Sequence, residues 1–402
     1  MTGGADSSWL PRHWLFFGRF PPPRDGQTLL TQQLLEMLGG EFTFLCADSS
    51  ARSPDGRVLP PGRLRLRRIP EMASYLWRIR RLAALYPFPI LYAIASGTWL
   101  GHLRDCAAFA GSIPRERPVV VWTHNSLLAL AASPLWRRSL RWLGHHIRIL
   151  VVPGKRLAEP LRELLPEERI AIIPNSIAQE MLCTDEEISR KLEHLQSLEE
   201  LRVLFVGHML PEKGGWELLE AAALLRRAGV ALRVSYAGGW VSAEDHQRFL
   251  RRVAALGLGS CVTHYGSIAH PEALRQLYLT HHIVALPTRH PTEAQPASIL
   301  EALNAACAIV STDHATIPEM VSPGVHGFLV CPSPEELAAA FARYWTTPGL
   351  WRSHAYAARR HFCASFAPEQ VRRRWRTLLQ HVEREYAQSL EGRRYRQLPL
   401  SL

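Results

Sequence analysis

Two glutamates, Glu293 and Glu301, lie eight positions apart in the stretch "PTEAQPASILEALNAACAIVST", residues 291–312. Pro296 predicts that a helix begins between them, because its fixed φ and missing N–H suit a first helical turn. Eight helical residues would separate the two acids by roughly 12 Å. Carboxylate pairs that hydrolyse a glycosidic bond face each other at about 5 to 9.5 Å, so this spacing argues against hydrolysis.

The helix N-terminus between the two acids offers a place for an anion. The amides of Ala297 and Ser298 precede the first intrahelical hydrogen bonds and lie at the positive end of the helix. An anion with a hydroxyl-rich group on each side describes a nucleotide sugar, which Glu293 and Glu301 could hold at its two ends. The same stretch also fits a solvated loop acid followed by an ordinary helix-forming glutamate.

A lysine and a glycine precede two other predicted helices. Lys213 follows the β-rich run "RVLFVG" and stands before Gly214 and Gly215, where a cation suits a phosphate and glycines let backbone come close. Gly26 follows the run "WLFFGRF" and three prolines, and its missing side chain would leave a helix end open to a ligand. Each residue alone also fits a surface lysine or a turn glycine.

His124 stands at the carboxyl end of the predicted strand "VVVWTH". A neutral imidazole there can exchange a hydrogen bond with a sugar hydroxyl or a phosphate, although 18 histidines in the chain make a strand-end histidine unexceptional. The glycines of "YAGGWV" lack GxGxxG spacing, and no HExxH, GxSxG or P-loop motif occurs. The sequence therefore argues against the enzyme classes that depend on these motifs.

Short β-rich runs alternate with helical segments in two successive series. The runs are "WLFFGRF", "FTFLCAD", "VVVWTH", "IRILVVPG" and "IAIIPN" in the first, and "RVLFVG", "LRVSYAG", "VTHYG", "HIVALPT" and "CAIVST" in the second. This alternation predicts an α/β protein with two doubly wound, parallel-sheet (Rossmann-like) domains facing a cleft. The expected parts are an N-terminal domain over 1–183, a charged linker over 184–200, a C-terminal domain over 201–350, and a helical segment with a tail over 351–402.

The formal net charge of +11 and the pI of about 9.7 imply anionic partners. Seven arginines fall within residues 63–82, and residues 133–148 combine arginine with Trp136 and Trp142. Such segments suit an anionic membrane surface or nucleic acid, and equally an ordinary solvated helix face. Nucleic acid is the less favoured option, because no known nucleic-acid-binding module accompanies the charge.

Cysteines and apolar runs indicate the setting of the chain. Seven cysteines are scattered singly without CxxC spacing, which is typical of reduced residues rather than disulfides or zinc ligands. The most membrane-like run, residues 87–100, falls short of the ~18 apolar residues that span a bilayer, and the N-terminus shows no signal pattern. We expect a soluble, cytoplasmic chain, with peripheral attachment to the inner face of the membrane as a further expectation.

Taken together, these stretches resemble the retaining GT-B glycosyltransferases of family 4 over most of the chain. The most specific motifs are "FVGHMLPEKGGWELLEA", "YAGG", "THYGSIAHPEALRQLYLTHHIVALPT" and "TEAQPASILEALNAACAIVSTDHATIPEMVSPGVHGFLV", which follow one another in family order. Earlier in the chain, "FPPPRDGQTLLTQQLL", "WTHNS" and "IIPNSI" resemble the family's glycine-containing first loop, its strand-end histidine and its Pro-Asn turn.

The resemblance implies a role for each candidate residue. Glu293 and His124 would be catalytic residues beside the transferred sugar. Lys213 would bind the diphosphate, and the loop of Gly26 would close over the phosphates. The full donor-binding set is Gly26, His208, Lys213, Ala297, Ser298 and Glu301, with Glu301 on the ribose hydroxyls. No metal is implied, and no cofactor either, because the nucleotide sugar is a co-substrate.

The sequence departs from the family pattern at several positions. His208 stands where the usual Gly-Arg-Leu has its arginine, so a side chain that is mostly neutral near pH 7 replaces a fixed cation. Ala294 and Ala306 replace the glycines that follow the first and second glutamates. Ala315 and Thr316 replace the paired glycines before "IPE".

The resemblance implies a metal-independent, retaining transferase that moves a sugar from a nucleoside diphosphate sugar, foremost a UDP-sugar. The acceptor would be a saccharide or a lipid-linked molecule in glycan or cell-surface polysaccharide synthesis. The departures keep a second hypothesis open, a catalytically weak or inactive binding protein derived from the GT-B fold. A basic module for a membrane surface or nucleic acid is the third.

Overall fold

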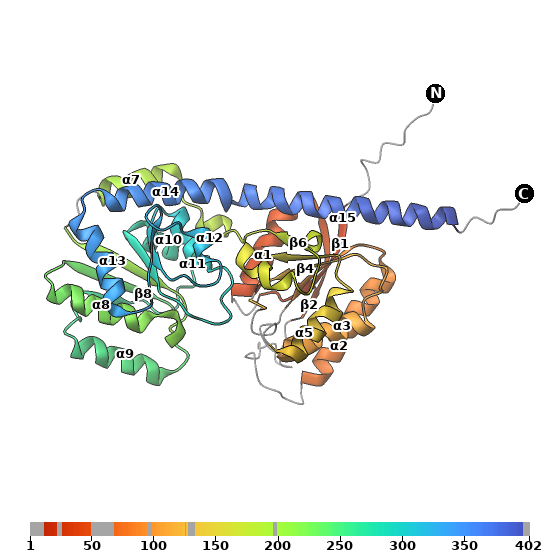
Figure 1. Ribbon diagram of the computed structural model, residues 1–402, viewed down its shortest axis with the longest axis horizontal. Coiled ribbons are helices and arrows are strands. Elements are labelled where there is room, and N and C mark those ends of the chain that lie inside the picture. Colours follow the sequence, from red (N-terminus) through yellow and green to blue (C-terminus); the bar gives the residue numbers. More distant parts are fainter. Residues whose placement is uncertain are drawn as a thin grey trace, which may run out of the picture. The chain divides into compact units, whose positions relative to one another are not determined.

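The structure is a computed structural model that describes residues 12–21, 26–49, 68–94, 99–124, 126–127, 133–195 and 199–396. The chain divides into two compact units, one formed by Met1–Pro174 with Val371–Leu402 and the other by Asn175–Gln370. Each unit contains a six-stranded sheet with helices packed on it (Figure 1). All strand pairs in both sheets are parallel. The predicted pair of doubly wound α/β domains is confirmed.

The sheet of the first unit has the strand order β2-β1-β3-β4-β5-β6. Its strands are β1 (His13–Gly18), β2 (Thr43–Asp48), β3 (Ile90–Ile94), β4 (Val119–Thr123), β5 (Ile149–Val152) and β6 (Ile170–Ile172). Its helices are α1 (Gly26–Leu38), α2 (Arg68–Leu85), α3 (Trp99–Gly111), α5 (Pro134–Gly144) and the short α6 (Lys155–Ala158), joined by most of α15 (Pro368–Arg396).

Two hydrophobic layers cover opposite faces of this sheet. Successive side chains of a strand alternate between faces, so Leu15 packs with α2, α3 and α5, whereas its neighbour Trp14 packs with α1 and α15. Trp375 of α15 is fully buried, and its ring lies 5.6 Å from that of Trp122 in β4. The helical segment expected to follow the second domain therefore completes the core of the first unit.

The apolar run at 87–100 contains β3, a strand between β1 and β4 whose five residues are all buried. A central parallel strand is covered on both faces, and this burial explains why its side chains are apolar throughout. Within the ranges that the structure describes, no helix combines the length and the hydropathy needed to cross a bilayer.

The sheet of the second unit has the strand order β12-β11-β10-β7-β8-β9. Its strands are β7 (Leu201–Val206), β8 (Leu232–Ala237), β9 (Val262–His264), β10 (Ile283–Leu286), β11 (Ala308–Ser311) and β12 (Gly327–Leu329). Its helices are α7 (Asp185–His194), α8 (Gly215–Arg227), α9 (Ala243–Ala255), α10 (Pro271–Leu279), α11 (Ala297–Asn304), α12 (Ile317–Met320), α13 (Pro334–Thr346) and α14 (Leu350–Ser365).

The segment expected as a charged linker, 184–200, contains α7, which packs into the second unit. Three of its four acids lie in the first turn, where they favour the helix N-terminus, while Ile188 and Leu192 are buried in the core. Lys191 is buried as well. Its ammonium group donates hydrogen bonds to the carbonyl oxygens of Tyr278 at 2.9 Å and Ala305 at 2.7 Å, which replace its contacts with water.

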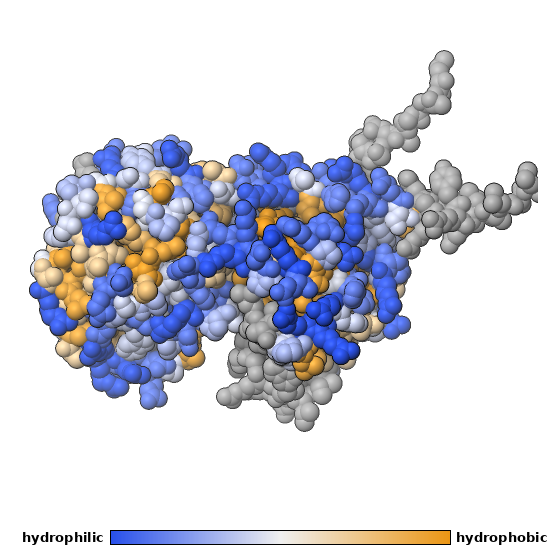
Figure 2. Space-filling model, viewed as in Figure 1, coloured by the Kyte–Doolittle hydropathy of each residue, from blue (hydrophilic) through white to orange (hydrophobic). Residues whose placement is uncertain are grey.

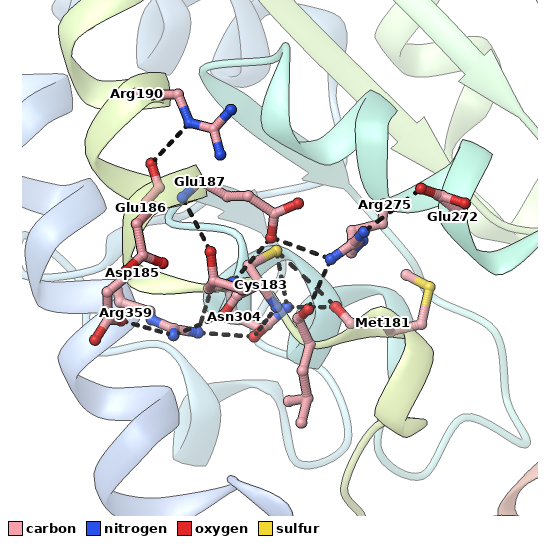
Figure 3. A network of polar contacts seen from close by, with 12 residues as sticks. Met181, Cys183, Asp185, Glu186, Glu187, Arg190, Glu272, Arg275, Asn304 and Arg359 are labelled. Atoms are coloured by element: carbon pink, nitrogen blue, oxygen red, sulfur yellow. Dashed lines mark hydrogen bonds and ion pairs between the residues drawn. The ribbon is translucent and has the colours of Figure 1, made fainter.

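Polar contacts bind the residues before α7 to the same unit (Figure 3). The side-chain amide of Asn304 donates to the carbonyl oxygen of Met181 at 2.8 Å, and Arg359 donates to that of Cys183 at 2.9 Å. The division between the units accordingly falls after Pro174, earlier in the chain than the expected boundary at 183.

Candidate active site

The candidate site lies at the edge of the second sheet where β7 and β10 end. These strands are parallel neighbours, so their carboxyl ends reach the same edge. Lys213 is in the loop after β7, and Glu293 is in the loop after β10. The ammonium group of Lys213 donates a hydrogen bond to Oε2 of Glu293, and the two side chains are only 16% and 11% exposed. The predicted phosphate-binding lysine and the predicted sugar-binding glutamate are thus partners in one ion pair.

Gly214 fixes the position of the lysine loop. Its φ of 82° is in the left-handed region, and a Cβ there would lie 2.4 Å from the carbonyl oxygen of Pro287, the first residue after β10. A side chain at this position would force the two loops apart. The N–H of Arg289 also donates to the carbonyl oxygen of Glu212 at 2.7 Å, which ties the loops together next to the ion pair.

Neutral polar groups surround the carboxylate of Glu293. The hydroxyl of Thr288 donates to Oε2 of Glu293 at 3.3 Å. Burial, reinforced by the charge of Lys213, lowers the pKa of nearby His290, so that ring is neutral at physiological pH. Lys213 is therefore the cation placed directly against the glutamate. Sequence reasoning missed Thr288, because its role depends on the fold of the loop.

Helix α11 begins directly after Pro296, as the sequence predicts. The carbonyl oxygen of Pro296, the N-cap residue, accepts hydrogen bonds from the N–H groups of Ile299 and Leu300. The N–H groups of Ala297 and Ser298 precede these bonds and lie at the positive end of the helix dipole. The arrangement retains the anion-binding potential that the sequence predicts for this helix end.

Glu301 lies on the second turn of α11 and is held by a tyrosine that sequence reasoning missed. The hydroxyl of Tyr278 donates to Oε2 of Glu301 at 2.6 Å. Burial raises the pKa of Glu301 to about 7, and the tyrosine hydrogen bond opposes that rise. Tyr278 is fully buried in α10 and looks like an ordinary core residue in sequence, 23 positions before its partner.

His208 follows β7 at the same edge of the sheet as Lys213 and is exposed. Two glycines make room for the loop on which it stands, because a Cβ on Gly238 would lie 1.8 Å from the carbonyl oxygen of Gly207. Among the residues that the structure describes, none forms a hydrogen bond with the His208 ring. Its imidazole is thus available to a ligand.

The other two candidate residues, His124 and Gly26, belong to the first unit. His124 follows β4 and is buried beside Trp122, with a ring-to-ring distance of 3.9 Å. Among the residues that the structure describes, neither ring nitrogen has a hydrogen-bond partner, and burial, together with Arg19, lowers the pKa of His124 to about 3. Gly26 is the first residue of α1, and a Cβ there would meet no atom of the described part of the chain within 4 Å, so packing against these residues does not require glycine.

The replaced glycines leave a trace in the backbone. Ala306 and Ala315 have φ of 50° and 49°, a left-handed conformation that side chains other than glycine rarely adopt. Thr316 has an ordinary φ of −92°, and its hydroxyl donates to the carbonyl oxygen of Ala294 at 2.7 Å. Ala306 and Ala315 thus have the backbone conformation that glycine adopts more readily than alanine.

Comparison with known families agrees with this architecture. The family model described as Glycosyltransferase Family 4 matches residues 28–180, and the one described as Glycosyl transferases group 1 matches residues 200–347. The chain belongs to the GT-B glycosyltransferases. The match to group 1 includes the Lys213–Glu293 pair and Glu301, and the family 4 match includes His124.

Individual relatives share this fold at low sequence identity. Alpha-D-kanosaminyltransferase of Streptomyces kanamyceticus is 27% identical over 247 residues, which cover 58% of this glycosyltransferase and 62% of that enzyme. The structure of Anabaena Alr3699/HepE in complex with UDP and glucose is 16% identical, with a TM-score of 0.66 over 91% of this chain and 99% of that one. Sucrose-phosphate synthase from Thermosynechococcus elongatus is 16% identical, with a TM-score of 0.72 over 93% of this chain and 100% of that one.

Proposed function

We propose that this chain transfers a sugar, with retention of configuration, from a nucleoside diphosphate sugar to a saccharide or lipid-linked acceptor. UDP is the proposed nucleotide. The observation that carries the proposal is the pairing of Lys213 with Glu293 at the edge of the second sheet. A cation beside an acid at the carboxyl ends of parallel strands suits a ligand that joins a diphosphate to a hydroxyl-rich ring.

The proposed roles follow from what each group can donate or accept. Lys213 and the amides of Ala297 and Ser298 donate to diphosphate oxygens, and His208 adds a further donor. Glu293 accepts hydrogen bonds from the sugar, and its charge favours a positive sugar centre as the bond to the diphosphate breaks. Glu301 accepts from the ribose hydroxyls through the oxygen that Tyr278 leaves free.

Catalysis in this proposal comes chiefly from stabilising the departing diphosphate. Negative charge grows on the phosphate oxygens as the glycosidic bond breaks, and fixed donors aimed at those oxygens lower the barrier. Lys213 and the helix amides are such donors, and no metal is assigned to the step. No residue of the chain is assigned as a nucleophile.

His124 offers a hydrogen bond to a hydroxyl or phosphate of a ligand. Its two buried nitrogens have no partner within the described ranges, which favours this role, since buried polar atoms are normally paired. The related structures of HepE are named for complexes with UDP, UDP-glucose and glucose, which supports a UDP-sugar as the first donor to test. The kanosaminyltransferase is named for a different sugar, so relatives leave several donors to compare.

A screen of nucleotide sugars tests the proposal. UDP-, GDP-, ADP- and dTDP-sugars are compared by the shift in the thermal unfolding midpoint, and the donors that bind are assayed for release of the nucleoside diphosphate. We expect a UDP-sugar to raise the midpoint and to be consumed. A folded protein that none of these donors stabilises or reacts with would instead support the inactive binding protein.

A further inference from the structure

Three helices of the first unit form a surface that the proposed transfer reaction does not use. Helices α2, α3 and α5 cover one face of the sheet, with α3 in contact with both of the others (Figure 1). Their outward residues include large apolar side chains beside arginines, named here the arginine–tryptophan face. Its members are Trp77, Arg80, Arg81 and Leu85 of α2, Leu103 of α3, and Leu135, Arg138, Arg141 and Trp142 of α5, all exposed.

The outward direction of the α2 members follows from helix geometry. Tyr75 and Ile79 are buried against the sheet, so Trp77 and Arg81 lie on the opposite side of the helix. Trp77 is 58% exposed, and the guanidinium of Arg81 lies 5.3 Å from the centre of its ring.

Helix α5 repeats this combination. Leu140 and Leu143 face the core, while Leu135 is 69% exposed and Trp142 is exposed beside Arg138. Exposed leucine and tryptophan side chains on neighbouring helices leave a large apolar surface in contact with water. Only a binding partner that covers these side chains removes that surface from water. In Figure 2 hydrophilic and hydrophobic residues lie side by side over these helices.

The charge of the face is almost entirely positive. The three helices contain eight arginines and two acids, Glu71 and Asp105. Asp105 is buried and accepts hydrogen bonds from Tyr92 and Arg104, so it does not neutralise the surface. Within the described ranges, Arg80, Arg81, Arg138 and Arg141 form no ion pair. A partner must therefore supply negative charge as well as apolar contact.

We propose that the arginine–tryptophan face docks the chain on an anionic lipid bilayer. Tryptophan favours the boundary between headgroups and acyl chains, and arginine pairs with lipid phosphates while its stem stays in that boundary. Nucleic acid would use the arginines but leaves the exposed leucines unexplained. The proposal goes beyond sugar transfer and does not depend on it, because binding to vesicles is measured without any donor.

Vesicle sedimentation with the full chain tests this docking. Vesicles of phosphatidylcholine containing about one third phosphatidylglycerol should bind the protein, and pure phosphatidylcholine should bind it far more weakly. Arg78 of α2 is exposed next to this face. Replacing Arg78, Arg80 and Arg81 by glutamine should weaken binding roughly a hundredfold, at about fivefold for each arginine, and reduce its salt dependence. Trp77→Ser should weaken binding at low and high salt alike, because it removes apolar contact.

A matched variant separates the face from the net charge of the chain. Arg226, Arg248 and Arg251 are exposed arginines of the second unit, and their triple replacement by glutamine removes the same charge. This control should bind vesicles like the wild type. Equal loss in both triple variants, or no effect of either, would overturn the proposal. The proposal would also be overturned if duplex DNA displaced the vesicles from the protein and if binding of the DNA depended on the same three arginines of α2.

Discussion

Lys213 and Glu293 neutralise one another across the loops that follow β7 and β10. Their hydrogen bond joins Nζ of the lysine to Oε2 of the glutamate, and both groups are largely shielded from water. A diphosphate that binds here competes with the glutamate for the lysine. Binding and catalysis therefore respond differently to changes at the two positions, and this difference can be measured.

Glu293→Gln separates the two responses. The amide keeps the shape of the side chain but not its charge, so transfer should fall by about a hundredfold or more. The affinity for UDP should stay the same or increase, because Lys213 no longer has an ionic partner in the free protein. Calorimetry and an assay of donor consumption on the same preparation measure both, with the exposed Glu212→Gln as control. A variant that transfers like the wild type would remove Glu293 from the site.

The pKa of Glu301 predicts how donor binding depends on pH. Burial raises that pKa to about 7, so acidification protonates the carboxyl and weakens it as an acceptor for ribose hydroxyls. The affinity for a UDP-sugar should therefore increase by roughly tenfold from about pH 6 to 8 if only the ionised form binds. Glu301→Gln should remove this component of the profile.

Tyr278→Phe extends the same prediction. The tyrosine hydrogen bond lowers the pKa of Glu301, so its removal should move the midpoint of the pH profile upward. Calorimetric titrations with the UDP-sugar at several pH values check this shift. A midpoint that moves downward, or a wild-type profile without pH dependence, would show that Glu301 does not bind the ribose as proposed.

His208→Arg restores the cation that the family usually has after this strand. Arginine carries a permanent charge and can donate two parallel hydrogen bonds to a phosphate, so the variant should bind UDP several-fold more tightly than the wild type. Calorimetric titration of UDP into both proteins measures the difference. Identical affinities would make His208 a bystander.

The strained alanines predict two stabilising substitutions. Ala306→Gly and Ala315→Gly relieve a left-handed conformation, and each should raise the free energy of unfolding by about 0.5–1 kcal/mol. Ala305→Gly is the matched control, because Ala305 is buried like Ala306 but has an ordinary φ of −85°, so glycine there removes a buried methyl group and adds flexibility without relieving strain. Chemical denaturation of the three variants gives the comparison. Equal destabilisation in all three would contradict the assignment of strain.

Much of the fold could be predicted from local patterns. The β-rich runs separated by helical segments correspond to ten of the strands, and Pro296 marks the start of α11. The positions of Lys213 and Glu293 after parallel strands follow from that alternation. Their direct contact does not, because it depends on Gly214 packing against Pro287, which involves residues far apart in sequence.

The remaining differences have physical causes that a single sequence conceals. Charged residues dominate 184–200, yet α7 is a structural helix since its buried lysine is satisfied by backbone carbonyls of distant elements. The apolar run at 87–100 is not among the predicted strands, yet it contains the core strand β3. Helix α15 returns to the first unit through a tryptophan that sequence alone assigns to no partner. Long-range partners decide each case.

A calorimetric titration of UDP tests most directly whether Lys213 binds the diphosphate. UDP is titrated into the wild-type protein, Lys213→Ala and the control Arg227→Ala. The arginine of the control is exposed on the same unit. A charge-assisted contact to phosphate is worth ~1.5–3 kcal/mol, so Lys213→Ala should weaken UDP binding by about 10- to 150-fold while the control binds like the wild type. UDP binding that is unchanged in Lys213→Ala would contradict the account, because the diphosphate would then be held elsewhere.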